Sequence, residues 1–131
     1  MILVDASVLA NVIADDGSDG DIARAEVAGA DGLAAPDLVD VETVAVLRKR
    51  WLAGDLSERR FSAALDDLED LEIDRYPGLV FVRRAFELRA NVTAYDAAYV
   101  GLAEALECEL VTADRRLQGA PGVRCEVRLV P

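Results

Sequence analysis

The sequence predicts an α/β fold with a mostly parallel central sheet of about five strands, flanked by helices on both faces. Short apolar runs such as 2–4 and 110–112 are typical of strands that are buried on both faces. These runs alternate with longer segments of helical periodicity, and this alternation indicates parallel strands joined by helices. With 131 residues, the chain is expected to form one domain that spans residues 1–131.

Each element follows from a local pattern of apolar and turn-forming residues. The segment ADDGSDGD is expected to be a turn-rich linker. Asp37 and Ser57 are expected to cap helices, and Gly54 to end one. In chain order, we expect strand 2–4, helix 6–14, helix 22–30, strand 32–36, helix 37–54, helix 57–72, a short strand at 71–73, helix 78–89, helix 92–107, strand 108–112 and an edge strand at 123–130.

The composition excludes several classes of chemistry. The chain has no histidine, so it can form neither a Ser-His-Asp triad nor a Cys-His pair nor a histidine-ligated zinc site. Cys108 and Cys125 show no metal-binding spacing and are expected to be buried free thiols. No apolar run approaches the roughly 20 residues of a membrane span, and no signal peptide is recognised, so we expect no membrane association and a cytoplasmic protein.

The net charge of −11 argues against nucleic-acid binding, because contacts to phosphates come from lysine and arginine. This argument against nucleic-acid binding weakens if several carboxylates bind divalent cations, since the bound ions would neutralise part of the negative charge. The positions of the acidic residues therefore decide whether this chain could bind cations and, through them, nucleic acid.

Three of these acidic residues lie where parallel strands or helices begin or end. Asp5 and Asp114 follow apolar strands, so both are expected at the same edge of the sheet, where ligands of α/β proteins bind. Asp96 lies in the first turn of a helix and beside an apolar stripe. Helix capping is an alternative for each helix start: Asp5 or Ser7 can cap the first helix, and Thr93 with Asp96 can form a capping box.

Glu42 has apolar residues on both sides at helical spacing, which predicts that it points into the buried side of its helix. An unpaired buried carboxylate costs several kcal/mol or takes up a proton. A salt bridge with an arginine is the structural alternative. Four acids at one edge would repel one another unless cations lie between them, and Mg²⁺ or Mn²⁺ suits a site made only of oxygen ligands. Two such ions can support hydrolysis of a phosphodiester.

The sequence resembles the PIN-domain nucleases, and most closely the VapC-type ribonuclease toxins of toxin–antitoxin pairs. The resemblance rests on ILVDASVL at the start, a glutamate in the helix after Pro36, VTAYDAAYVGLAEAL, and LVTADRRL, and it covers essentially the whole chain. It implies that Asp5, Glu42, Asp96 and Asp114 are the catalytic, metal-binding carboxylates. Ser7 and Thr112 would orient these acids by hydrogen bonds.

The resemblance also implies a metal-dependent endoribonuclease that cuts RNA, forms a homodimer and is inhibited by a cognate antitoxin. One departure affects the number of ions: some relatives carry a further acidic or amide residue after the fourth acid, where this chain has Arg115, Arg116 and Leu117. One tight and one weak ion are then as compatible with the sequence as two. Arg115 and Arg116 could contact RNA phosphates or belong to a solvated turn.

Two other classes of acidic α/β protein do not fit these residues. A phosphotransfer receiver domain needs a lysine after a late strand, but the only lysine, Lys49, lies in an early helix. A phosphatase with an aspartyl nucleophile needs a second aspartate two residues after the first, where this chain has Ser7. The remaining alternative is a PIN-like scaffold that binds a protein or RNA partner without cleaving anything.

Overall fold

A computed structural model describes all 131 residues and contains one sheet of five parallel strands in the order β3-β2-β1-β4-β5. The register pairs Leu3 of the central strand β1 with Ala34 on one side and Leu110 on the other. Because all strands run in the same direction, their carboxyl ends share one edge of the sheet. The strands are β1 Ile2–Val4, β2 Leu33–Pro36, β3 Asp74–Tyr76, β4 Leu110–Thr112 and β5 Val127–Leu129.

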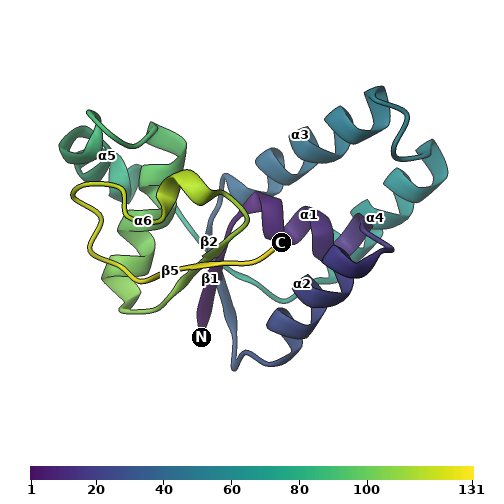
Figure 1. Cartoon of the computed structure of the whole chain (residues 1–131), viewed down its shortest axis with the longest axis horizontal. Coiled ribbons are helices and arrows are strands. Elements are labelled where there is room, and N and C mark those ends of the chain that lie inside the picture. Colours follow the sequence, from purple (N-terminus) through teal and green to yellow (C-terminus); the bar gives the residue numbers. More distant parts are fainter.

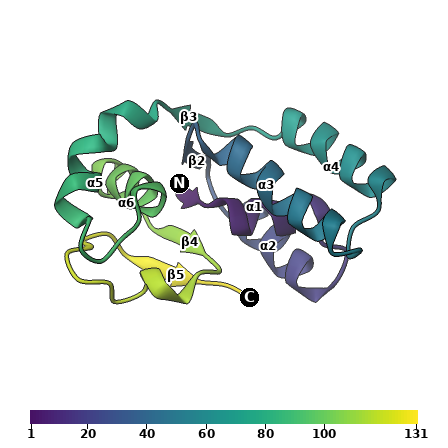
Figure 2. The same cartoon turned by 90° about the horizontal axis from the view of Figure 1, so that it is seen from above.

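Helices cover both faces of the sheet, as predicted. Figure 1 shows α5 and α6 on one side of the strands and α1 to α4 on the other, and Figure 2 confirms this arrangement from above. The helices are α1 Ala6–Ala14, α2 Ser18–Ala28, α3 Val39–Leu52, α4 Glu58–Asp70, α5 Val82–Leu88 and α6 Ala94–Leu106, and two short 3₁₀ helices, η1 Gly78–Phe81 and η2 Arg115–Leu117, complete the chain. None of these helices has the length and apolarity needed to cross a membrane.

The core lies between the central strands and helices α1 and α6. Leu3, Val4 and Val111 have no exposed surface, in agreement with the prediction of strands buried on both faces. Helix α6 contributes seven consecutive buried residues, 97–103. Because such a helix is apolar around most of its circumference, it is fixed firmly against the sheet. Polar side chains at its N-terminal end are therefore held in a defined position.

Helix α2 begins four residues before the predicted start, inside the segment that we expected to be a linker. Asp19 and Asp21 lie in its first turn, where negative charge interacts favourably with the helix dipole. Gly20 allows this turn to pack against α1, because a Cβ atom there would lie 1.8 Å from the Asp15 carbonyl oxygen. The polar composition masked a helix that tertiary contact with α1 stabilises.

Two further details differ from the sequence-based predictions. Strand β3 occupies 74–76 instead of 71–73, where the chain pairs with β2. Asp37 does not cap α3; its carboxylate accepts a hydrogen bond from the Gly78 backbone N–H at 3.1 Å, and Leu38 occupies the cap position without a side-chain bond. In contrast, Asp5, Ser57 and Thr93 each cap a helix through a side-chain oxygen, as predicted.

The segment that leads into β5 is held by two arginines. Arg84 of α5 donates to both carboxylate oxygens of Glu104 and to the Gly122 carbonyl oxygen. Arg128 of β5 forms ion pairs with Glu26 and Glu109. Cys108 and Cys125 precede the paired strands β4 and β5. Both are free, as expected, but they are half-buried instead of fully buried.

Candidate active site

Asp5 lies directly after β1 and is 8% exposed. Its Oδ1 atom accepts hydrogen bonds from the Ser7 hydroxyl at 2.5 Å and from the Val8 backbone N–H at 3.2 Å. The Asp5 side chain therefore caps α1 while it also lies at the edge of the sheet, so the two uses that the sequence left open are compatible. Burial raises the pKa of Asp5, and the hydrogen bonds from Ser7 and Thr112 oppose this effect.

Ser7 and Thr112 join the ends of the two central strands. Thr112 is fully buried at the end of β4 and donates its hydroxyl hydrogen to Oδ2 of Asp5. The same hydroxyl oxygen accepts from the Asp114 backbone N–H at 2.9 Å, and the Ser7 hydroxyl accepts from the Ala113 N–H at 3.1 Å. Both side chains thus contact Asp5 and also fix the loop that carries Asp114.

Asp96 occupies the first turn of α6, where its backbone N–H donates to the Thr93 hydroxyl at 3.1 Å. This bond is the Thr93 half of the capping box that the sequence suggested. The Asp96 carboxyl group is half-buried, and its pKa is raised chiefly by desolvation and further by the negative charges of Asp114 and Asp5. Capping by Thr93 therefore leaves the Asp96 carboxylate beside two other acids.

Glu42 lies at the edge of the buried face of α3, not within it as predicted. The fully buried positions of this helix are Val39, Thr43 and Leu47, which repeat every four residues and leave Glu42 half-buried. No arginine or lysine forms a salt bridge with Glu42, so the structural alternative is not observed. Desolvation raises the pKa of Glu42 most, and the charges of Asp96 and Asp5 add to the effect.

The partner of Glu42 is Tyr99, whose hydroxyl donates to Oε1 at 2.8 Å. Tyr99 lies three residues after Asp96 on α6, is 2% exposed, and has a raised pKa because it is buried and faces Glu42. Tyr99 belongs to the apolar stripe beside which Asp96 was predicted to lie. Its spacing from Asp96 was visible in the sequence, whereas its contact with a residue 57 positions away was not.

Asp114 lies two residues after β4, and its carboxylate faces Arg116. Arg116 Nη2 lies 2.7 Å from Asp114 Oδ2, and Nε lies 3.0 Å from Oδ1. This guanidinium lowers the pKa of Asp114, while Arg116 itself remains 83% exposed in its side chain. Arg116, which the sequence left open as a phosphate contact or a residue of a solvated turn, thus forms an ion pair with Asp114.

The tertiary structure thus gathers the four predicted carboxylates from four separate segments. Mutual charge effects connect Glu42 to Asp96 and Asp5, and Asp96 to Asp114 and Asp5. No three acidic or cysteine side chains lie close enough to enclose a single metal ion as they stand. One of the four, Asp114, is turned toward Arg116 and forms an ion pair with it.

The donor set nevertheless suits a hard divalent cation. It consists of carboxylate oxygens, and its neighbours Ser7, Thr112 and Tyr99 hold individual oxygens by neutral hydrogen bonds. Cavities of about 770 and 810 Å³ lie elsewhere, the first beside Cys108 and Cys125 and the second beside Asn11 and Arg50. Neither cavity includes the four carboxylates.

Comparison with known proteins places this arrangement in a family. The model of the PIN domain family matches residues 2–123. The chain belongs to the PIN-domain family. This confirms the family predicted from the sequence, and the matched residues include Asp5, Glu42, Asp96 and Asp114.

The PIN-domain relatives that match are named as ribonucleases and toxins. The chain is 41% identical to "VapC ribonuclease Mb0985" of Mycobacterium bovis over 131 residues, which covers 100% of this chain and 99% of the relative. The crystal structure of Mycobacterium tuberculosis VapC20, described as a Sarcin-Ricin loop cleaving toxin, has a TM-score of 0.71 at 17% identity, and the match covers 95% of this chain and 99% of that one. VapBC2 from Rickettsia felis, crystallised bound to a DNA fragment from its promoter, has a TM-score of 0.67 at 14% identity and full coverage of both chains.

Proposed function

We propose that this PIN-domain protein is a divalent-metal-dependent endoribonuclease toxin of the VapC type. The observation that carries the proposal is the gathering of Asp5, Glu42, Asp96 and Asp114 around the carboxyl ends of β1 and β4, without a histidine or lysine among them. A group of mutually repelling carboxylates costs stability. Cation binding would explain why the chain carries this group of carboxylates despite the cost. A relative of this chain is named VapC ribonuclease.

The four carboxylates would hold Mg²⁺ or Mn²⁺, which prefer oxygen ligands. When bound, such an ion supplies positive charge that activates water and stabilises the oxygen leaving a phosphodiester. The chain's own residues prepare the site. Thr112 and Ser7 fix both oxygens of Asp5, and α6 positions Asp96 at its first turn. The site would hold one ion or two.

RNA suits this site because a polymer does not need an enclosed pocket, and the carboxylates line neither of the two large cavities. The charge of −11 opposes binding of a polyanion, so bound cations would also reduce repulsion of the substrate. We place this activity in the cytoplasm, where RNA substrates occur. We treat residues 1–131 as one PIN domain, because β5, beyond the matched residues, extends the same sheet.

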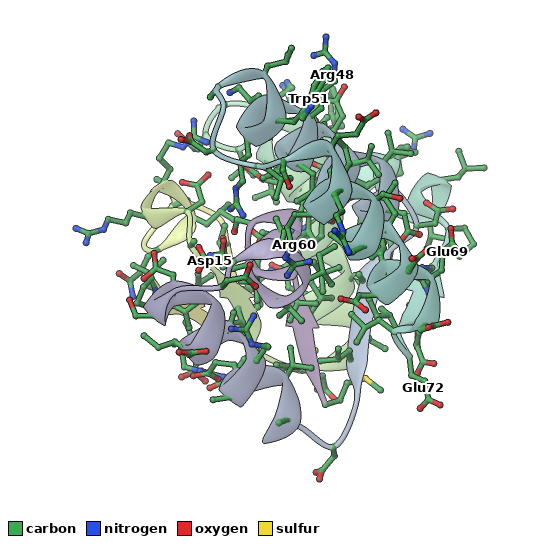
Figure 3. The ribbon with its side chains drawn as sticks, turned by 90° about the vertical axis from the view of Figure 1, so that its right-hand side faces the viewer. Asp15, Arg48, Trp51, Arg60, Glu69 and Glu72 are labelled. Carbon is green, nitrogen blue, oxygen red and sulfur yellow. The ribbon has the colours of Figure 1, made fainter.

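The proposed partners are a cognate antitoxin and a second copy of the chain. The acidic surface would complement a basic segment of an antitoxin. Exposed apolar side chains support association: Figure 3 shows Trp51 and Arg48 at the outer end of α3, and Leu79, Val80 and Phe86 are exposed around η1 and α5. Light scattering on the purified chain tests the homodimer, and a monomer at about 100 µM would contradict it.

Cleavage of a labelled pool of structured RNAs tests the function directly. The protein is incubated with Mg²⁺, with Mn²⁺ or with EDTA, and Glu42→Gln is the matched variant. We expect metal-dependent cutting at a few sites, which EDTA and the variant abolish. If the wild-type chain cuts no RNA under any condition, the alternative of a non-catalytic scaffold replaces this proposal, and partner capture becomes the next experiment.

A further inference from the structure

The hydroxyl of Tyr99 has one hydrogen-bond partner, and that partner is an acid of the proposed site. The ring is enclosed in the core at 2% exposure, on the same helix face as Asp96. Its hydroxyl donates to Glu42 Oε1 at 2.8 Å. Because a carboxylate carries no hydrogen to donate, the direction of this bond is fixed: tyrosine donates and glutamate accepts.

The bond leaves the two oxygens of Glu42 in different states. Oε1 is held by Tyr99, whereas Oε2 accepts no hydrogen bond from the protein. Glu42 projects from α3 and is only half-buried, so its long side chain has several rotamers available. A donor fixed in the rigid core restricts the rotamers of Glu42 and leaves Oε2 free.

The neutral character of the donor matters as much as its position. An arginine in place of Tyr99 would also hold Glu42, but its charge would compete with a cation for the carboxylate. A phenol holds the oxygen without neutralising it. Tyr99 therefore satisfies the requirement of a buried hydroxyl for a partner and preserves the negative charge of the site.

We propose that Tyr99 is a positioning residue that orients Glu42 toward the divalent cation, so that α6 supplies both Asp96 and the group that aligns Glu42. This inference rests on the proposed function, because it assigns Tyr99 a role at the same site. A merely structural tyrosine would contribute to folding alone. A positioning tyrosine also sets the affinity for the ion.

The substitution Tyr99→Phe removes the hydroxyl and keeps the buried ring. Tyr95→Phe is a matched control, because it makes the same chemical change on the same helix at a position that is 66% exposed. Mn²⁺ binding is measured without RNA, by calorimetry and by the electron paramagnetic resonance signal of the free ion. We expect Tyr99→Phe to weaken Mn²⁺ binding roughly tenfold and Tyr95→Phe to leave it unchanged.

A double-mutant cycle with Glu42→Gln tests whether the effect passes through Glu42. Tyr99→Phe should have no further effect on Mn²⁺ affinity once Glu42 is replaced. An equal loss in both backgrounds would overturn the assignment, as would unchanged Mn²⁺ affinity of Tyr99→Phe.

A second measurement needs no variant and so does not depend on Tyr99→Phe folding. The chain has three tyrosines, and their ring Cζ carbons can be labelled with ¹³C and followed by nuclear magnetic resonance. We expect added Mg²⁺ to shift the Tyr99 signal and to leave that of exposed Tyr95 in place. An unmoved Tyr99 signal in a protein that binds Mg²⁺ would overturn this inference alone. A wild-type chain that binds no divalent cation would overturn it together with the proposed function.

Discussion

Thr112 donates a hydrogen bond to Asp5 across 107 positions of sequence, from the end of one central strand to the end of its neighbour. The pairing of β1 with β4 brings the two residues together. The same threonine oxygen accepts from the Asp114 N–H, so one hydroxyl links two of the four carboxylate-bearing segments. The network makes Thr112 a position where a small change should have a large effect.

We expect Thr112→Val to destabilise the protein by about 1–3 kcal/mol, because it leaves Asp5 Oδ2 and the Asp114 N–H without their partner. Thr112→Ser retains the hydroxyl and loses one buried methyl group, which costs about 1 kcal/mol. Urea unfolding in EDTA measures the free energy of unfolding of both variants. Wild-type stability of Thr112→Val would show that the hydroxyl network contributes nothing.

Asp96→Asn should reduce RNA cleavage by about 100-fold or more while the fold is retained. Asparagine has nearly the same shape but carries no charge for a cation. The Thr93 cap is unaffected, because it uses the backbone N–H of residue 96. Cleavage rate and circular dichroism are measured together, and wild-type cleavage by a folded variant would remove Asp96 from the site.

Arg116→Gln should strengthen Mn²⁺ binding by about two- to fivefold, because Arg116 holds the Asp114 carboxylate in an ion pair that a cation must displace. Arg115→Gln is the control: it removes the same charge from the same 3₁₀ turn at a residue that forms no ion pair. Calorimetry at low salt measures the Mn²⁺ affinity of both variants. An equal gain for both variants would indicate a general effect of net charge and not release of Asp114.

Glu42 should make the stability of the metal-free protein depend on pH. Its pKa is raised above the ordinary value of 4.5, so the protonated form favours folding; this contribution is present below pH 4.5 and is lost as the pH rises through the raised pKa. Glu42→Gln cannot ionise and still offers Tyr99 an acceptor. We expect its Tm in EDTA to exceed that of the wild type at pH 7.5, and this gain to disappear near pH 4.

A lower Tm of Glu42→Gln at pH 7.5 would contradict the assigned cause. With a divalent cation present, the wild type should have a higher Tm than Glu42→Gln, because only the wild-type carboxylate binds the ion. Thermal unfolding with and without Mg²⁺ provides this internal control.

Gly20→Ala should destabilise the contact between α1 and α2 by about 1–3 kcal/mol. The new Cβ would lie 1.8 Å from the Asp15 carbonyl oxygen, which is backbone and cannot move aside. Gly32→Ala is the matched control, since the nearest atom there is the tip of the Met1 side chain at 3.7 Å. In denaturant unfolding, Gly20→Ala should have a lower free energy of unfolding than Gly32→Ala. Equal values would mean that α2 shifts at little cost.

Much of the fold was predictable from local sequence pattern: the strand and helix order, the position of α1 and the ends of β1 and β4. These features follow from short-range patterns: apolar runs, helical spacing and capping residues such as Asp5 and Ser57. The edge of the sheet where Asp5 and Asp114 lie was also predictable, because parallel strands place their carboxyl ends together. Where polar composition hid a helix, as in α2, local pattern was insufficient.

The long-range contacts of the carboxylates could not be predicted from local pattern. The hydroxyl of Tyr99 on α6 reaches Glu42 on α3 across 57 positions of sequence, whereas Arg116 contacts Asp114 within a short turn. Side-chain direction and long-range distance are set by the packing of whole elements, and no spacing along the chain encodes them. The sequence therefore identified the acids, and the packing of α3 and α6 against the sheet determined their neighbours and their pKa shifts.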